Sequence, residues 1–457
     1  MQERRELTHR EINRDLLRPV LTTPLWFWAA LGFLGTVVAG GGIAYGLSWK
    51  FGTGMFGLNR PVMWGFIITN FVFWVGISHA GIMLSAILRL TQAEWRRPLT
   101  RAAEVLTIFS LQAAVLMPLI HMGRTWRFYW TFPYDFARGI WPNVRSPLIW
   151  DPAAITTYLT STVLFVFILL LPDLAIIRDR TTGIRSRIYG ALSLGWRGTS
   201  RQWKLQIIAG ILLSALILPV FVSVHSIVSW DFAVAASVEG WHATIFAPYF
   251  VIGAVHSGVS GVVTVAAMLV WLYRLDAYIR PEHFDALGRL LIVIAVTWFY
   301  FFILEFFMGL YSGHGAEVAL RDTQVFRWPF NMLFIVFLLT GFIIPVSLWM
   351  FRSVRRSVAM MFWTSILVNI GMWIERFLII VPSLMRKQSL SFNWGSYSPS
   401  PVEFLIVCGS FGLVFLGMLV FSKLLPIIPV ADAKEGKALS QVVQIGKVQV
   451  PAIYREE

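Results

Sequence analysis

Apolar residues form ten long runs along the chain, and short polar segments separate them. Crossing the hydrocarbon core of a bilayer takes roughly 20 mostly apolar residues in a helix. Lipid offers the backbone no hydrogen-bond partner and no series of short alternating strands is visible, so all ten runs should be α-helices. The chain is therefore predicted to be an all-α integral membrane protein with ten transmembrane helices. The predicted spans cover residues 25–48, 62–89, 102–120, 153–173, 205–227, 244–272, 287–309, 328–350, 357–383 and 402–425.

The distribution of Lys and Arg among the polar segments predicts the orientation. Of the 38 Lys and Arg residues, 27 lie in the two tails and the loops on their side, ten lie in the opposite loops, and Arg376 lies inside a span. Because basic residues concentrate on the cytoplasmic side, both termini are predicted to be cytoplasmic. The first run, from Leu25 to Trp49, is too long for the core of a signal peptide, so we expect it to remain as the first span.

Composition agrees with a membrane protein and limits its cofactors and partners. Hydrophobic residues make up 57% of the chain and charged residues 14%, against about 25% charged residues in soluble domains. The net charge of +14 comes from cations in short loops, where lipid headgroups explain them, so we expect a lipid bilayer and no nucleic acid as partner. A single cysteine, Cys408, lies in an apolar run, so this chain should hold no iron–sulfur cluster and no c-type haem.

A weak internal echo suggests a duplicated architecture. The sequence SHAG around His79 resembles VHSG around His256, 177 residues later. It predicts two four-helix bundles, spans 2–5 and 6–9, with the first and last spans as peripheral helices. The corresponding divisions are 1–61 for the N-terminal tail and first span, 62–227 and 228–383 for the two bundles, and 384–457 for the last span and C-terminal tail.

The polar, aromatic stretch from Leu119 to Tyr158 is the strongest candidate for a functional site. His121 ends the third predicted span and Asp151 opens the fourth. Oxidising a quinol releases two protons with two electrons, and a histidine and a carboxylate are suited to accept them. Two structural alternatives stay open: Asp151, which precedes Pro152, could cap its helix, and His121 could face lipid headgroups.

Further ionisable residues are predicted to lie within or at the ends of spans, where a charge costs about 2.5–3.5 kcal/mol at the bilayer centre. They are either polar contacts between helices or members of a proton path. Neighbours on a helix point to different sides, so Glu375 and Arg376 should have separate partners. The candidates for the path are His79, Asp173, His225, Asp231, His256, Glu305, Glu375 and Arg376.

The remaining histidines allow simpler interpretations. A haem-binding cytochrome b needs two histidines at one depth for each haem, and His79 with His256 offers a single such pair, so haem is not expected. Outer-loop residues His242, His314 and Glu317 are predicted to be surface residues. His9 and His283 are predicted to be solvated.

Several long, irregular strings resemble the NrfD/PsrC family of quinone-interacting membrane subunits, and within it the ten-span ActC type of alternative complex III. The resemblance covers roughly residues 60–310 and is thinner beyond. The matching strings are FWVGISHAG (73–81), MPLIHMGRTW (117–126), GIWPNVRSPLIWDPAAITTYL (139–159), LLPDLAIIRDR (170–180), IYGALSLGWRG (188–198), VHSIVSWDFA (224–233) and GWHATIFAPYFVIGA (240–254).

The resemblance implies two four-helix bundles and a subunit of a quinol:electron-acceptor oxidoreductase in a bacterial inner membrane, in a respiratory or photosynthetic chain. Quinol or menaquinol would be oxidised near the periplasmic face, with possible proton translocation. The implied partners are a periplasmic iron–sulfur subunit, multihaem cytochrome c subunits and a second NrfD-like membrane subunit. By position, His121 and Asp151 would be catalytic. Further candidates for quinol contact are His79, Arg124, Trp126, Trp150 and Tyr158.

Two other functions stay open: a quinone-reducing subunit of another oxidoreductase, and a proton-conducting or scaffolding subunit without its own quinol site. The segment Arg138–Ser146 (RGIWPNVRS) is predicted to dock the iron–sulfur partner, because Trp and Arg are enriched in protein interfaces. Lipid headgroups are the alternative contact for these residues.

Overall fold

The structure is a computed structural model that describes residues 8–144, 146, 149–236, 238–387, 394–439, 442–445 and 448–451. Within these residues, ten helices are long and apolar enough to cross a membrane. The predicted multi-pass membrane protein with helical spans is therefore confirmed, and one short β-hairpin after the last helix is the exception to the all-α prediction. The spanning helices are α2 (Leu25–Phe51), α3 (Phe66–Leu90), α4 (Thr100–His121), α5 (Trp150–Arg178), α7 (Ser200–Trp230), α8 (Phe246–Tyr273), α9 (Pro281–Tyr311), α11 and α12 (Phe330–Leu338, Ile344–Trp349), α14 (Val358–Met385) and α15 (Pro401–Leu424).

Shorter elements, which the hydrophobic pattern did not predict, lie between and beyond the spans. Two are π-helical: η6 (Asp231–Ala236) continues α7, and η7 (Leu339–Ile343) joins α11 to α12. A small antiparallel hairpin, β1 (Val442–Ile445) with β2 (Val448–Pro451), follows the last helix. The others are α1 (His9–Leu21), α6 (Gly183–Leu192), α10 (Gly315–Phe326), α13 (Arg352–Arg355), α16 (Val430–Leu439), and 3₁₀ turns η1 (Thr53–Met55), η2 (Glu94–Arg96), η3 (Thr125–Thr131) and η4 (Phe136–Arg138).

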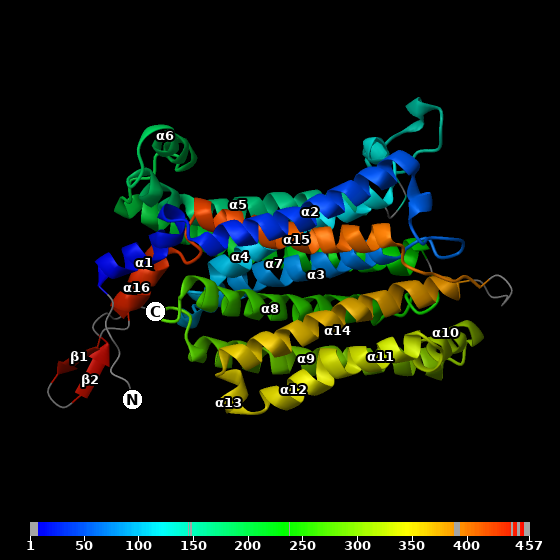
Figure 1. The fold of residues 1–457 in the computed structure, drawn as a ribbon. Coiled ribbons are helices and arrows are strands. Elements are labelled where there is room, and N and C mark those ends of the chain that lie inside the picture. Colours follow the sequence, from blue (N-terminus) through cyan, green and yellow to red (C-terminus); the bar gives the residue numbers. More distant parts are fainter. Residues whose placement is uncertain are drawn as a thin grey trace.

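The spanning helices run alongside one another (Figure 1). Helices α1 and α16 lie at one end of this array, which we call the terminal end. Helix α10 and the η3 and η4 turns lie at the opposite end, which we call the distal end. An even number of spans brings both tails to the same end. That the terminal end faces the cytoplasm stays a prediction.

Helices α3 and α8 are the most deeply buried spans and pack directly against each other. Small residues make this approach possible: a Cβ added at Gly258 would collide with Cβ of Ala80. Gly81 is equally close to α4, because its Cβ would collide with Oγ1 of Thr107. The small residues of the echoed SHAG and VHSG strings are thus helix-packing positions. The grouping into two four-helix bundles stays a prediction.

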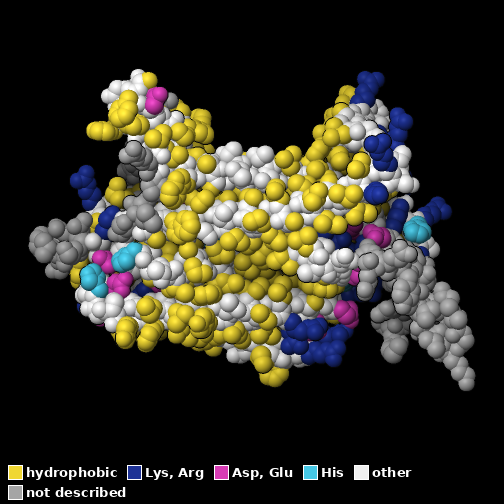
Figure 2. Space-filling view, turned by 180° about the vertical axis from the view of Figure 1, so that it is seen from behind, with side chains coloured by type: hydrophobic (Ala, Val, Ile, Leu, Met, Phe, Trp, Pro, Cys, Tyr) yellow, Lys and Arg dark blue, Asp and Glu magenta, His cyan; other side chains and the backbone are white. Residues whose placement is uncertain are grey.

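The surface fits a bilayer. In Figure 2 hydrophobic side chains cover the middle of the visible face, whereas charged side chains gather toward its two ends. A lipid-facing belt between two polar ends is what a membrane-spanning helix array requires.

Candidate functional site

His121 and Asp151 lie at the distal end of the molecule, on two helices that contact each other. His121 is the last residue of α4, and Asp151 lies in the first turn of α5. His121 Nδ1 and Asp151 Oδ1 are both buried without a hydrogen-bond partner. Among the described residues, no hydrogen bond or ion pair joins these two side chains. Buried polar atoms are normally satisfied, so these two unsatisfied atoms mark a candidate ligand site.

The interpretation of Asp151 as a helix cap is wrong. The residue preceding α5 is Ile149, and no side chain caps the helix. Asp151 instead faces the carboxyl group of Asp231 at close range. Asp231 begins the π-helical segment η6, and its side chain is buried. The site therefore contains two neighbouring carboxyl groups, where the sequence suggested one.

A compact cluster of His79, Tyr158 and His225 lies deeper in the helices. Tyr158 follows Asp151 by two turns of α5, so both residues lie on one face of that helix. The ring centroids of Tyr158 and His79 are 4.3 Å apart, and the Tyr158 hydroxyl donates to the carbonyl of Ser78 over 2.9 Å. His79 Nδ1 lies 3.3 Å from His225 Nδ1. The structure thus joins three residues that the sequence placed on three separate spans.

The other predicted quinol contacts lie nearer the surface. Arg124 is exposed. Trp126 is half exposed, with its ring 5.3 Å from that of Trp49 in α2, and Trp150 is 43% exposed. Their role as quinol contacts stays a prediction.

The predicted docking segment is only partly described. Trp141 is 83% exposed. The side chain of Arg138 and the whole of residue 145 lie outside the described residues.

Glu375 and Arg376, on α14, have the separate partners that their spacing predicts. Glu375 Oε1 accepts hydrogen bonds from the Tyr249 hydroxyl and, over 3.0 Å, from Trp298 Nε1. Arg376 Nη2 lies 3.4 Å from the carbonyl oxygen of Phe250, which is also 3.1 Å from His225 Nε2. In addition, Arg376 Nη1 reaches back to within 3.4 Å of Glu375 Oε2.

Glu305 is the acidic residue that lies near Glu375 in space. Glu305 Oε1 pairs with Arg321 Nη2 of α10 over 3.2 Å. Both glutamates line one cavity of about 30 Å³, which has room for about one water molecule. These contacts form a spatial series that starts at His225, in the first half of the chain. It continues in the second half through Arg376, Glu375 and Glu305.

Two members of the predicted proton path lie apart from this series. His256 Nε2 lies 2.9 Å from the carbonyl oxygen of Gly341 in η7, and its ring stacks on Trp298. Asp173 is at the terminal end, where its Oδ2 pairs with Arg101 Nη1 over 3.0 Å. The predicted path is therefore not one chain of direct contacts within the described residues.

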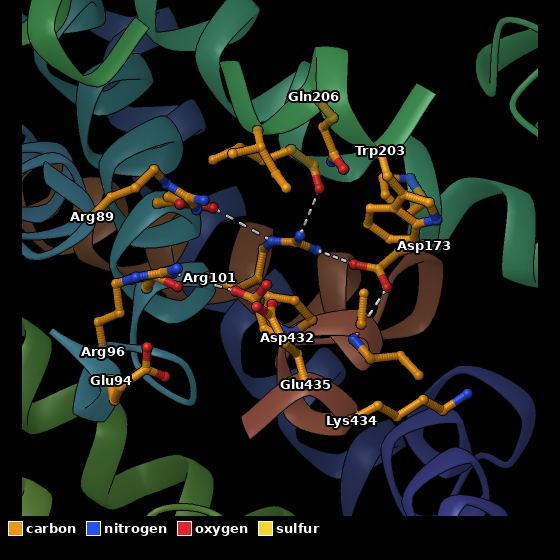
Figure 3. Close-up of a pocket in the computed structure, with 18 of the residues that line it drawn as sticks. Arg89, Glu94, Arg96, Arg101, Asp173, Trp203, Gln206, Asp432, Lys434 and Glu435 are labelled. Carbon is orange, nitrogen blue, oxygen red and sulfur yellow. Dashed lines mark hydrogen bonds and ion pairs between the residues drawn. The ribbon is translucent and has the colours of Figure 1, made fainter. Parts of the chain in front are cut away.

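The surroundings of Asp173 form the largest cavity we describe, with a volume of about 790 Å³. Figure 3 shows Arg101 and Asp173 pointing toward each other in it. Arg101 Nε also lies 3.4 Å from Glu104 Oε2, and the backbone N–H of Val430 donates to Asp173 Oδ1 over 3.2 Å. These contacts attach the segment that starts α16 to the helix array.

Sequence reasoning missed several of these partners. Arg101 and Arg321 were counted as loop cations, although both are buried. Asp151 and Asp231 each follow a tryptophan, at 150–151 and 230–231, but a shared dipeptide does not predict a contact. Tyr249 and Glu104 had no distinguishing feature in the sequence.

A family model described as "Polysulphide reductase, NrfD" matches residues 54–387, from η1 to just beyond α14. The chain belongs to the NrfD family. The match includes every residue of the distal site and of the buried clusters just described, apart from the contacts made by α16. The predicted family is therefore confirmed, whereas a particular likeness to the ActC subunit is not part of this finding.

Relatives of this NrfD-family chain share its length. A putative membrane subunit of a dimethyl sulfoxide reductase from Halobacterium salinarum is 24% identical, over 82% of this chain and 85% of the relative. A subunit of the selenate reductase of Mesobacillus selenatarsenatis is 24% identical, over 84% and 90%. An Hdr-like menaquinol oxidoreductase integral membrane subunit of Archaeoglobus fulgidus is 22% identical, over 90% and 95%. The chain is thus similar to membrane subunits of oxidoreductase complexes.

Proposed function

We propose that this chain is the quinol-oxidising membrane subunit of a multisubunit quinol:electron-acceptor oxidoreductase. The observation that carries the proposal is the pair of buried, unsatisfied atoms His121 Nδ1 and Asp151 Oδ1 at the distal end. A quinol has two hydroxyl groups, which can donate to a histidine nitrogen and a carboxylate oxygen. The name of the Archaeoglobus relative includes menaquinol, which favours menaquinol as the substrate here.

Residues of the site are placed to accept the protons that quinol oxidation releases. Oxidising one quinol releases two protons and two electrons. His121 accepts one proton at Nδ1, and Asp151, which lies beside the carboxyl group of Asp231, accepts the other. General acid–base groups act when they lie within hydrogen-bond reach of the proton they take. The electrons must leave the chain, because one cysteine cannot ligate an iron–sulfur cluster.

The electron acceptor in this proposal is an iron–sulfur subunit docked at the distal end. Trp141, which is 83% exposed, is the described anchor of the predicted docking segment. In an arrangement like alternative complex III, multihaem cytochrome c subunits and a second NrfD-like membrane subunit would complete the assembly. The distal end would then face the periplasm.

A scaffolding or purely proton-conducting subunit is the alternative from another class. Such a subunit would keep the buried charges between helices and would not need unsatisfied polar atoms at a helix end. The neighbouring carboxyl groups of Asp151 and Asp231, with Asp151 Oδ1 buried without a hydrogen-bond partner, favour a substrate site. A quinone-reducing subunit would use the same residues with the reaction reversed.

The decisive experiment compares Asp151→Asn with Asp135→Asn in the intact, purified complex. Asp135 is a true cap, because its side chain accepts from the backbone N–H of Ala137, and Asn caps as well as Asp. We expect Asp151→Asn to lower quinol-dependent electron transfer by about 10²- to 10⁴-fold, and Asp135→Asn to leave it unchanged. Equal rates in wild type and Asp151→Asn, with quinol analogue still bound, would exclude the proton-accepting role.

A further inference from the structure

Two glutamate–histidine pairs with the same spacing meet at the distal end. Glu239 and His242 lie in the segment between η6 and α8, and His314 and Glu317 lie at the start of α10. Each pair is separated by three positions, and His314 follows His242 by 72 positions. In Figure 2 histidine and acidic side chains sit together on the surface at the left of the view, the end at which α10 lies. The sequence analysis predicted His242, His314 and Glu317 as separate surface residues. For Glu317 that prediction is wrong, because its side chain is buried.

The distances between these side chains suit a small cation. One ligand atom each of Glu239, His242 and Glu317 lies within 4.8 Å of the others. His242 Nε2 is 3.8 Å from Glu239 Oε2 and 3.7 Å from Glu317 Oε1, and His314 Nδ1 is 3.5 Å from Glu239 Oε2. Tetrahedral zinc with bonds of about 2.0–2.2 Å sets its ligand atoms about 3.4 Å apart. Small side-chain movements therefore bring the ligand atoms of Glu239, His242 and Glu317 to bonding distance. His314 lies beside Glu239, outside this group of three.

The side chains are also oriented as metal ligands are. His242 Nδ1 lies 3.3 Å from the carbonyl oxygen of Val238. A carbonyl only accepts, so Nδ1 carries a proton and the ring presents Nε2 to the carboxylates. In the neutral ring Nε2 is then the bare ligand atom, an arrangement common for metal-bound histidines. Ser312 Oγ donates to Glu317 Oε2 over 3.2 Å and holds that carboxylate. Glu239 Oε2 is buried without a hydrogen-bond partner.

We propose that Glu239, His242 and Glu317 bind a divalent transition metal of the zinc type, with His314 as the fourth ligand. Imidazole and carboxylate ligands suit zinc, and the two carboxylates balance the charge of the ion. The metal links the segment that follows Asp231 to α10, so it stabilises the distal end. This site is separate from the proposed quinol site, and neither proposal depends on the other.

The test is zinc binding to the full-length chain, purified in detergent without a polyhistidine tag and stripped of metal with a chelator. Isothermal titration and elemental analysis should find one zinc ion per wild-type chain. Because each variant removes a ligand, we expect His242→Ala and Glu317→Gln to weaken zinc binding at least tenfold. Titration with Co²⁺ should give the visible absorption of a tetrahedral ion in wild type and lose it in both variants.

His9→Ala is the matched control, since His9 is exposed on α1 at the terminal end. It should bind zinc as tightly as wild type. Glu317→Gln keeps the size of the side chain, and its thermal unfolding without metal reports whether it is folded. The proposal fails if wild type binds no zinc, or if the folded variants bind it with the stoichiometry and affinity of wild type.

Discussion

His79 Nδ1 lies 3.3 Å from His225 Nδ1. In the neutral rings, this contact together with that of His225 to Phe250 determines which nitrogens carry protons. The carbonyl oxygen of Phe250 only accepts, so His225 Nε2, 3.1 Å away, must carry a proton. His225 Nδ1 is then bare and accepts from His79 Nδ1–H. His79 Nε2 is left as a bare acceptor, and it is buried without a hydrogen-bond partner. His79 Nε2 is thus the nitrogen of the cluster that accepts no hydrogen bond within the described residues.

His79→Phe should lower quinol-dependent electron transfer about tenfold or more, because a phenyl ring keeps the packing against Tyr158 but has no bare nitrogen. The measurement is the steady-state rate in the assembled complex, together with the amount of each subunit present. His9→Phe, which changes an exposed histidine on α1 at the terminal end, serves as control. His283 would not serve, because it is half-buried, contrary to prediction, and its Nδ1 accepts from the backbone N–H of Arg280. A His79→Phe complex as fast as wild type would limit His79 to a packing role.

Tyr158→Phe should have a small effect, below tenfold in rate. The Tyr158 hydroxyl already donates to the carbonyl of Ser78, and that carbonyl keeps a second donor, Thr107 Oγ1 at 2.9 Å, when the tyrosine is changed. Losing one such bond costs about 1 kcal/mol. If Tyr158→Phe instead raised the KM for quinol strongly, the hydroxyl would have to leave Ser78 and bind the substrate, as the sequence analysis predicted.

Arg101→Ala should destabilise the folded chain by about 3–5 kcal/mol, because it leaves the carboxylates of Asp173 and Glu104 buried without their partner. The free energy of unfolding in mixed detergent micelles would measure this. Arg289→Ala is the control: Arg289 is 66% exposed, and its partner Asp285 also pairs with Arg355. An exposed ion pair contributes about 0–1 kcal/mol, so equal losses in the two variants would contradict the burial argument.

The spans could be predicted from sequence because lipid imposes a simple rule on length and polarity. All ten predicted spans correspond to spanning helices, and most ends differ by only a few residues. The π-helical segment η6, with Asp231 at its start, could not be predicted in this way. It interrupts no apolar run, and its geometry depends on packing at the distal end.

The site was predicted as residue types and positions along the chain, but its pairings were not. His121 and Asp151 stood out because each lies at the end of a span. The contact of Asp151 with Asp231 and that of His79 with His225 depend on how α3, α5 and α7 are arranged around one another. The ion pair of Arg321 with Glu305 could not be predicted for a related reason. Arg321 belongs to a short outer helix that folds back onto Glu305.

Proton movement through the second half of the chain is the last prediction. His225 and Arg376 share the carbonyl oxygen of Phe250, Arg376 pairs with Glu375, and Glu375 shares a cavity of about 30 Å³ with Glu305. A water molecule there would complete a hydrogen-bonded connection between the two glutamates. If protons cross the membrane through this connection, more protons should be released per quinol than the two that quinol oxidation itself supplies.

The measurement is proton release per quinol oxidised by the complex in sealed vesicles. Glu305→Gln should reduce the number to that of the chemistry alone, because an amide cannot accept and release the proton as a carboxylate does. Glu282→Gln is the control on the same helix, since Glu282 is 59% exposed and pairs with Arg356 at the terminal end. Equal numbers and equal rates in wild type and both variants would leave Glu305 as a structural partner of Arg321.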